Sequence, residues 1–133
     1  MADHRYVPPG TSADDRHRVA LAILLSQLKM RLRMTINTIL DIRVHTRGMT
    51  EAEALRLMQV RGHQEEGEAV GKWRRALLTS CQLSTYYVGF VAVDDVVRTL
   101  QSARPEWREK QVHDAVLAHG SPPPRHLPTL LGL

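Results

Sequence analysis

One long amphipathic pattern places the strongest constraint on how this chain folds. It runs from about Asp15 to Thr46 or Arg47, and its mostly apolar positions recur in alternating steps of four and three residues. Such spacing places the side chains on one face of an α-helix. These positions are Leu21, Leu25, Leu28, Leu32, Thr35, Ile39 and Ile42. Further apolar residues lie on other sides of the same segment, so this helix requires packing partners around much of its surface.

Helix-start and helix-stop residues divide the rest of the chain. Asp14 or Asp15 is the expected N-cap of the long helix, and Gly48 follows its end, where glycine tolerates a left-handed backbone. Thr50 and Glu53 have the spacing of a capping box, which predicts the start of a short helix. This short helix is expected to end near Arg61 and Gly62, and the next helix to begin around Gln64. After a break near Thr79 and Ser80, a further helix is expected from Cys81 to about Ser102, where Arg104-Pro105 stops it. The last predicted helix spans Glu106 to Ala118.

The predicted fold class is all-α, with about five helices that include the long N-terminal one. Residues Tyr86 to Val93 have β propensity, but their flanks are helical and no hairpin signal lies beside them, so a helix is favoured. The expected organisation is an extended lead-in over residues 1–15, a helical domain over 16–120, and a Pro-rich linker with a docking tail over 121–133.

Composition excludes several classes of protein. One cysteine in 133 residues excludes an internal disulfide framework and a Cys-based zinc finger. The longest apolar run, Val19 to Leu25, has seven residues, whereas a membrane span needs about 20. No apolar leader follows Met1, so no secretory signal and a cytoplasmic location are expected. The net charge of +4 is spread along the chain, which makes nucleic-acid binding the least favoured function.

No complete catalytic or metal motif occurs in the chain. No two of the seven histidines lie four residues apart, so an H-E-x-x-H zinc site is absent from this sequence. His113, His119 and His126 are interpreted as surface residues. Cys81 is interpreted as a small core residue, because no activating base is evident near it.

Two pairs with i, i+4 spacing are candidates for chemistry. Asp41 and His45 meet on one helix face, where a carboxylate fixes the imidazole tautomer for hydrogen-bond donation to developing charge. The alternative is an ordinary pair near a helix C-terminus. Gln82 and Tyr86 have the same spacing, and a tyrosine hydroxyl can stabilise an oxyanion. The alternative is that Tyr86 is half-buried with its hydroxyl at the rim of the core.

Two features of residues 64–75 also stay open. Gly67 and Gly71 either allow another backbone to approach closely or are simply two small residues in a helix. Lys72 to Arg75, with Trp73 among them, form either an anion clamp or a solvated face with one buried tryptophan.

Four ordered blocks resemble a bacterial family, the domain of unknown function 885. The blocks are residues 41–55, 64–75, 82–89 and 113–123. The family is similar to helical zinc peptidases of the gluzincin type, and the resemblance is to its C-terminal end. Longer members carry the H-E-x-x-H helix and a Glu-Gly-Trp motif upstream, which implies zinc for those members and no cofactor or metal ligand within this chain.

The resemblance also implies roles for individual residues. His45 and Tyr86 would stabilise the oxyanion of a tetrahedral intermediate, and Arg43 and Gln82 would contact substrate. Many relatives have lysine where Tyr87 stands.

The expected function follows from this resemblance. The chain is expected to be the C-terminal segment of a larger metallopeptidase-like fold, inactive by itself because the zinc motif is absent. Its expected partners are the N-terminal catalytic portion or a second copy of itself, with a peptide-like substrate only when completed. The alternative is a free-standing helical protein–protein interaction module.

Overall fold

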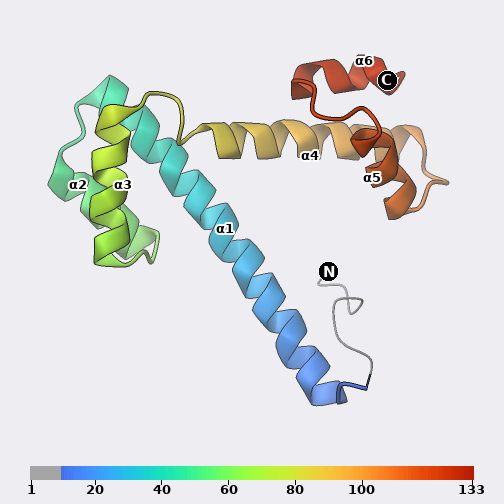
Figure 1. The fold of residues 1–133 in the computed structure, drawn as a ribbon, viewed down its shortest axis with the longest axis horizontal. Helices are drawn as coiled ribbons and strands as arrows, with labels where there is room; N and C mark the ends of the chain where they lie inside the picture. Colours follow the sequence, from blue (N-terminus) through green and yellow to red (C-terminus); the bar gives the residue numbers. More distant parts are fainter. Residues whose placement is uncertain (1–9) are drawn as a thin grey trace. The chain divides into compact units, whose positions relative to one another are not determined.

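A computed structural model describes residues 10–133, and these residues form helices and no strand (Figure 1). The predicted all-α class is confirmed. The first nine residues, which include most of the expected lead-in, lie outside the described residues. The chain divides into two compact units, one ending at Ser84 and one spanning Thr85–Leu133. The position of one unit relative to the other is not determined, so each is described by itself. Within residues 10–133, no helix is long and apolar enough to cross a bilayer.

The long helix α1 spans Ala13–Arg47 and has caps at both ends. The Ser12 hydroxyl accepts the Asp15 N–H at 3.1 Å. The expectation that Asp14 or Asp15 is the N-cap is therefore wrong. Both aspartates lie in the first helical turn, where carboxylates are favoured by the helix dipole. At the other end Gly48 has φ 60°, as predicted for a left-handed C-cap.

A second helix follows almost directly. α2 spans Glu51–Arg56 and continues as a five-residue π-helix, η2, over Leu57–Arg61. The predicted capping box is present: Glu53 accepts the Thr50 N–H at 2.9 Å, and the Thr50 hydroxyl accepts the Glu53 N–H at 3.4 Å. The predicted end near Arg61 and Gly62 is confirmed. The next helix, α3, spans Glu66–Leu78 and begins two residues after the expected start.

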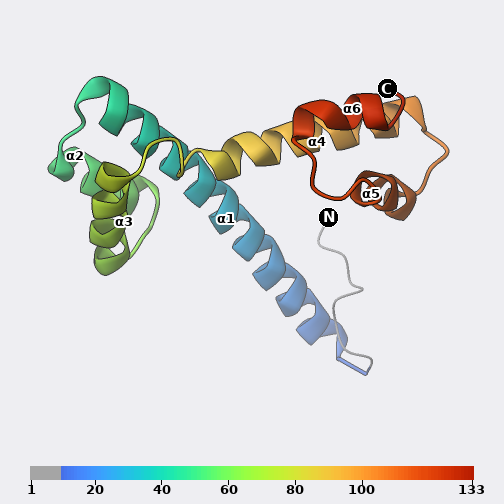
Figure 2. The same cartoon turned by 45° about the horizontal axis from the view of Figure 1, so that its top comes forward.

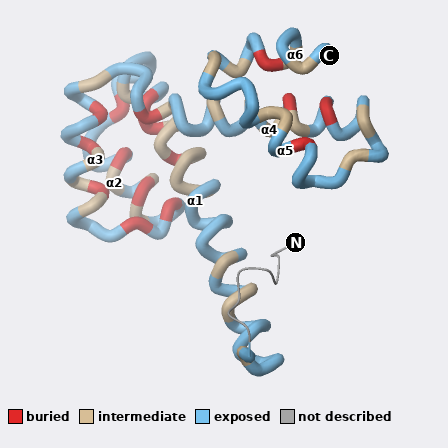
Figure 3. Tube along the Cα trace, turned by 45° about the vertical axis from the view of Figure 1, so that its right-hand side comes forward, coloured by how far each residue is buried: buried red, intermediate tan, exposed pale blue. Residues whose placement is uncertain are grey.

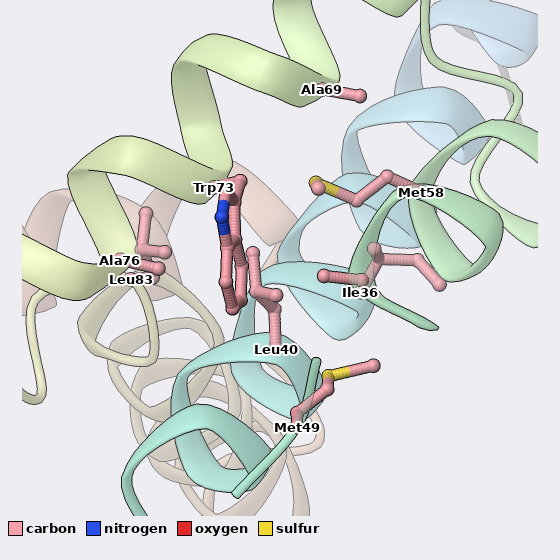
Figure 4. Packing of buried hydrophobic residues seen from close by; sticks show 9 residues of the cluster. Ile36, Leu40, Met49, Met58, Ala69, Trp73, Ala76 and Leu83 are labelled. Atoms are coloured by element: carbon pink, nitrogen blue, oxygen red, sulfur yellow. The ribbon is translucent and has the colours of Figure 1, made fainter. Parts of the chain in front are cut away.

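The core of the first unit joins the C-terminal half of α1 to α2, η2 and α3. Trp73 of α3 is buried beside Leu40 of α1, and Met58 of η2 is fully enclosed (Figure 4). The rest of this core is Ile36, Met49, Ala54, Ala69, Ala76 and Leu83. The N-terminal half of α1 extends beyond this packed region, and its residues are exposed or only partly buried (Figure 3).

A turn over residues 79–84 separates α3 from α4, which spans Thr85–Ala103. The prediction of a helix starting at Cys81 is therefore wrong. Cys81 has φ 62°, a left-handed conformation incompatible with a continuing helix, and it is exposed rather than in the core. The predicted helical state of residues 86–93 is confirmed, and α4 ends before Arg104-Pro105 as expected.

The second unit is built on α4. Helix α5 spans Glu109–Leu117, a 3-10 helix η3 spans Pro124–His126, and α6 spans Leu127–Leu130 (Figure 2). α5 starts three residues later than predicted. Both α5 and η3 pack against α4. The buried apolar residues of this unit are Val96, Leu100, Val112 and Leu127.

Candidate functional site

Asp41 is a buried carboxylate near the C-terminal end of α1. Its side chain is 3% exposed and accepts hydrogen bonds from the turn that precedes α4. Oδ1 accepts the Cys81 N–H at 3.2 Å, and Oδ2 accepts the Ser84 N–H at 3.0 Å and the Ser84 hydroxyl at 2.9 Å. A charged acceptor makes such bonds stronger than neutral ones. Asp41 thus holds a turn about forty positions away in sequence.

His45 contacts the same turn from the next turn of α1. Its Nε2 lies 2.9 Å from the Thr79 carbonyl oxygen and 3.5 Å from Asp41 Oδ1. Both neighbours are acceptors, so Nε2 carries the proton and donates it to the Thr79 carbonyl. The predicted contact between Asp41 and His45 is present. Both side chains, however, form their hydrogen bonds with the turn over residues 79–84.

Gln82 lies within this turn rather than on α4. Its Oε1 accepts a hydrogen bond from Arg75 Nε at 2.9 Å. The expectation that Gln82 and Tyr86 pair along one helix is wrong, because α4 begins at Thr85. The predicted break near Thr79 and Ser80 is present, but it extends to Ser84. The sequence pattern missed this extension because the residues after Cys81 are typical of helices.

Tyr86 is the second residue of α4 and belongs to the second unit. Tyr86 is 59% exposed, so the alternative of a half-buried tyrosine at the rim of the core is wrong. His45 and Tyr86 lie in different units, and the structure assigns no distance between them. The structure brings together Asp41, His45 and the turn that contains Gln82.

Arg43 is exposed and lines a hollow of about 830 Å³ between the end of α1, α2 and η2. Three further arginines line it: Arg47, Arg56 and Arg61. The sequence singled out Arg43 alone. The other three were missed because the four converge from separate elements, and no spacing along the chain shows this.

Glu53 lines the same hollow and is the one carboxylate among its lining residues. Hydrogen bonds from the Thr50 backbone and hydroxyl, with a smaller contribution from the charge of Arg43, hold the pKa of Glu53 below its ordinary value. Glu53 is therefore ionised at neutral pH.

The basic-aromatic cluster over residues 72–75 separates into different environments. Trp73 enters the core, whereas Arg74 points to solvent. Lys72 donates to Gln64 Oε1 at 2.7 Å and to Glu68 Oε1 at 3.3 Å. Burial lowers the pKa of Lys72, and Glu68 offsets this in part. The arrangement agrees with the solvated face containing one buried tryptophan, not with an anion clamp.

Among the described residues, no other backbone segment packs closely against the two glycines of α3. No atom lies within 4 Å of the position that a Cβ would take at Gly67 or Gly71. They are two small residues on an open helix surface.

Within residues 10–133, no group of three or more His, Cys, Asp or Glu side chains is arranged to hold a metal ion. His113, His119 and His126 are exposed, as predicted. The residues present do not fit the zinc site that the family resemblance implies for longer members, so no catalytic step of this chain is derived through zinc.

Comparison with known families agrees with the four sequence blocks. The model of a family described as bacterial proteins of unknown function, DUF885, matches residues 17–131. The chain belongs to the DUF885 family. Comparison with curated proteins gives no significant match.

A solved structure extends this result. The DUF885 chain is similar to "a putative lipoprotein of unknown function" from Shewanella oneidensis, with 37% sequence identity and a TM-score of 0.74. The similarity covers 79% of the DUF885 chain but 19% of the Shewanella chain. The DUF885 chain thus spans about a fifth of the length of this structural relative.

Proposed function

We propose that this chain is the C-terminal helical part of a larger zinc-peptidase-like protein of the DUF885 family, and that it is inactive by itself. Family membership over residues 17–131 supports this assignment. The 19% share of the Shewanella chain supports a larger whole. The absence of H-E-x-x-H from this sequence supports inactivity of the isolated chain.

The observation that carries the proposal is the uncovered apolar surface of α1. Leu21, Leu25 and Leu28 share one helix face, and each is more than half exposed. Exposed leucines at this spacing are typical of a face that packs against another protein surface. In the proposed assembly, the remainder of the protein covers this face.

Four residues have proposed roles in the completed protein. His45 and Tyr86 would donate hydrogen bonds to the oxyanion of a tetrahedral intermediate, and Arg43 and Gln82 would contact a peptide-like substrate. The Nε2 proton of His45 already points to a carbonyl oxygen, which supports its role as a donor. For His45 to act on substrate, its bond to the Thr79 carbonyl must be exchanged for one to the oxyanion.

The first experiment is an immunoblot of source cells with an antibody against this segment. A band several-fold larger than 15.1 kDa would support the proposal. A band at 15.1 kDa would show that the short chain exists by itself, which contradicts it.

A second experiment tests activity and residue roles together. The chain is co-expressed with the H-E-x-x-H-containing part of a DUF885 relative, and zinc-dependent peptide hydrolysis is measured. His45→Ala and Tyr86→Phe should lower kcat, because each removes an oxyanion donor. The control His113→Ala, at an exposed histidine of α5, should leave kcat unchanged. Hydrolysis that is equal in all three variants would contradict the roles of His45 and Tyr86.

A free-standing helical interaction module is the second candidate function. The same exposed leucines of α1 favour it, because a second copy of the chain can also cover them. A stable, cooperatively unfolding dimer of the 133-residue chain, with no association to the zinc-motif part, would favour this candidate.

A cytoplasmic location remains part of the proposal. The lone Cys81 supports a reducing compartment, whereas the structural relative is described as a lipoprotein. Fractionation of source cells, followed by the same immunoblot, distinguishes a cytoplasmic from a membrane-associated protein.

A further inference from the structure

A basic hollow on the first unit extends well beyond the one arginine to which the proposed function assigns a role. It lies between the C-terminal end of α1, α2 and η2 and has a volume of about 830 Å³. Arg43 and Arg47 come from α1, Arg56 from α2, and Arg61 from η2. A hollow of this size is within the range of ligand-binding sites.

Among residues 10–133, the positive charge of this hollow is balanced only in part. The four arginines face one carboxylate, Glu53, whose Oε2 already accepts the Thr50 N–H at 2.9 Å and the Thr50 hydroxyl at 2.8 Å. None of the four guanidinium groups forms an ion pair or hydrogen bond with another side chain among residues 10–133. Their donors are therefore available to an external anion.

The same surface contains apolar side chains between the arginines. Ile42 is 52% exposed and Val60 is 62% exposed, and Leu57 lies beside them in the lining. A ligand that satisfies the whole surface must combine anionic groups with apolar ones. A small inorganic anion would leave the apolar part in water.

The π-helix contributes directly to this surface. Leu57, Val60 and Arg61, which are the first, fourth and last residues of η2, all line the hollow. Short π-helical turns occur frequently at functional sites. No aromatic side chain is among the lining residues, so the surface lacks the stacking platforms that single-stranded nucleic acids use.

We propose that this hollow binds an acidic peptide segment whose carboxylates alternate with apolar side chains. The planar guanidinium groups of Arg47, Arg56 and Arg61 bind the carboxylates, which they can hold through two parallel hydrogen bonds. Ile42, Leu57 and Val60 contact the apolar side chains. This proposal concerns binding by the 133-residue chain and does not rest on peptidase activity.

Fluorescence anisotropy with labelled hexapeptides tests the proposal on the full chain. The probe is an alternating Glu-Leu peptide, and the controls are a neutral Gln-Leu peptide and an equally charged Glu-Gly peptide. Both controls should bind at least about tenfold more weakly, because each lacks one half of the recognition. Equal binding of the Glu-Leu peptide and either control would overturn the proposal.

Matched variants locate the site. The triple substitution Arg47→Gln, Arg56→Gln and Arg61→Gln should weaken binding of the Glu-Leu peptide about tenfold or more. The control triple Arg16→Gln, Arg18→Gln and Arg74→Gln removes the same charge from exposed positions elsewhere and should change binding less than about twofold. Equal losses in the two triples would mean a non-specific basic surface and would overturn the proposal.

Two further measurements keep the test decisive. The single variant Arg61→Gln should weaken binding of the Glu-Leu peptide about threefold. It replaces the triple variant of the hollow in this test if that variant does not fold. A labelled single-stranded oligonucleotide should bind more weakly than the Glu-Leu peptide. If the oligonucleotide binds more tightly than the peptide, and the variants of the hollow lose this binding, the hollow binds nucleic acid and the peptide proposal is overturned.

Discussion

Asp41 shows how one side chain can organise a turn distant in sequence. Its two oxygens accept three hydrogen bonds from Cys81 and Ser84, and His45 adds a fourth contact through the Thr79 carbonyl. Such bonds are valuable because a buried N–H left without an acceptor is costly. The turn therefore has its left-handed Cys81 conformation because α1 supplies acceptors at the right place.

Replacing Asp41 tests this organisation. Asp41→Ala should lower the free energy of unfolding by about 3 kcal/mol, since it removes a buried charged acceptor. Asp41→Asn should lower it less, because one side-chain oxygen remains. The measurement is urea unfolding followed by circular dichroism. Asp95→Ala, at an exposed aspartate of α4, is the control, and an equal effect of the two alanine variants would contradict the interpretation.

The partly buried Lys72 should make the free energy of unfolding depend on pH. Because burial lowers its folded pKa below the ordinary value of 10.5, the unfolded chain binds more protons between these two values. The free energy of unfolding contributed by Lys72 should therefore rise with pH across this window. The measurement is the free energy of unfolding of wild type minus that of Lys72→Met. This difference should be larger at about pH 10 than at about pH 7.5.

The exposed Lys110 is the matched control for that experiment. Its side chain is 79% exposed and forms an ion pair with Asp114 of the same helix. Because folding does not bury its ammonium group, the free-energy difference between wild type and Lys110→Met should lack the burial-driven rise expected for Lys72→Met. A constant difference for Lys72→Met as well would show that the burial of Lys72 does not affect its titration.

Pair spacing within one helix was the most predictable feature at the residue scale. The contact of Asp41 with His45 follows from i, i+4 geometry. The partners of this pair were not predictable, since Thr79, Cys81 and Ser84 meet it only through the tertiary fold. Likewise, Gln82 was assigned to a helix because local propensity does not show a left-handed residue such as Cys81.

At the scale of elements, helix ends were predicted best where a single residue type is required. Gly48 at the end of α1 and the capping box at the start of α2 were both found as expected. The N-cap of α1 was misplaced because Ser12, Asp14 and Asp15 are all good capping residues, and sequence alone does not choose among them. Starts of α3 and α5 shifted by two or three residues for similar reasons.

Two glycine substitutions should have opposite effects on stability. Gly48 has φ 60°, so Gly48→Ala should lower the free energy of unfolding by about 1 kcal/mol. Gly71 lies inside α3 with open space around its Cβ position, so Gly71→Ala should raise it by about 1 kcal/mol. Thermal unfolding of the two variants measures both effects. A shift of the same sign in both would contradict this assignment of the two glycines.

On the scale of the whole molecule, apolar surface remains outside the two cores. The sequence predicted this for α1, because the helix is apolar on several sides and the other helices are short. The structure agrees within the first unit: the C-terminal half of α1 is packed, and the N-terminal half carries exposed leucines. What covers them was not predictable, because neither periodicity nor composition identifies a partner.

Self-association of the isolated chain should depend on this face. Wild type should show a concentration-dependent mass above 15.1 kDa in size-exclusion chromatography with light scattering. The double variant Leu25→Gln and Leu28→Gln should remain monomeric, because it removes apolar area from the face. Leu78→Gln, at the exposed end of α3, is the control and should associate like wild type. Equal association of both variants would place the contact elsewhere.

The two halves of α1 should also differ in how long their backbone hydrogens survive exchange with deuterated water. Around Ile36 and Leu40, exchange requires the core to open, whereas near Leu21 local fraying is enough. One continuous helix would thus show a gradient of protection, low toward Ser12 and high toward Gly48. Any molecule that docks on the leucine face would extend the protected region toward Ser12. Exchange in the N-terminal half of α1 therefore reports assembly.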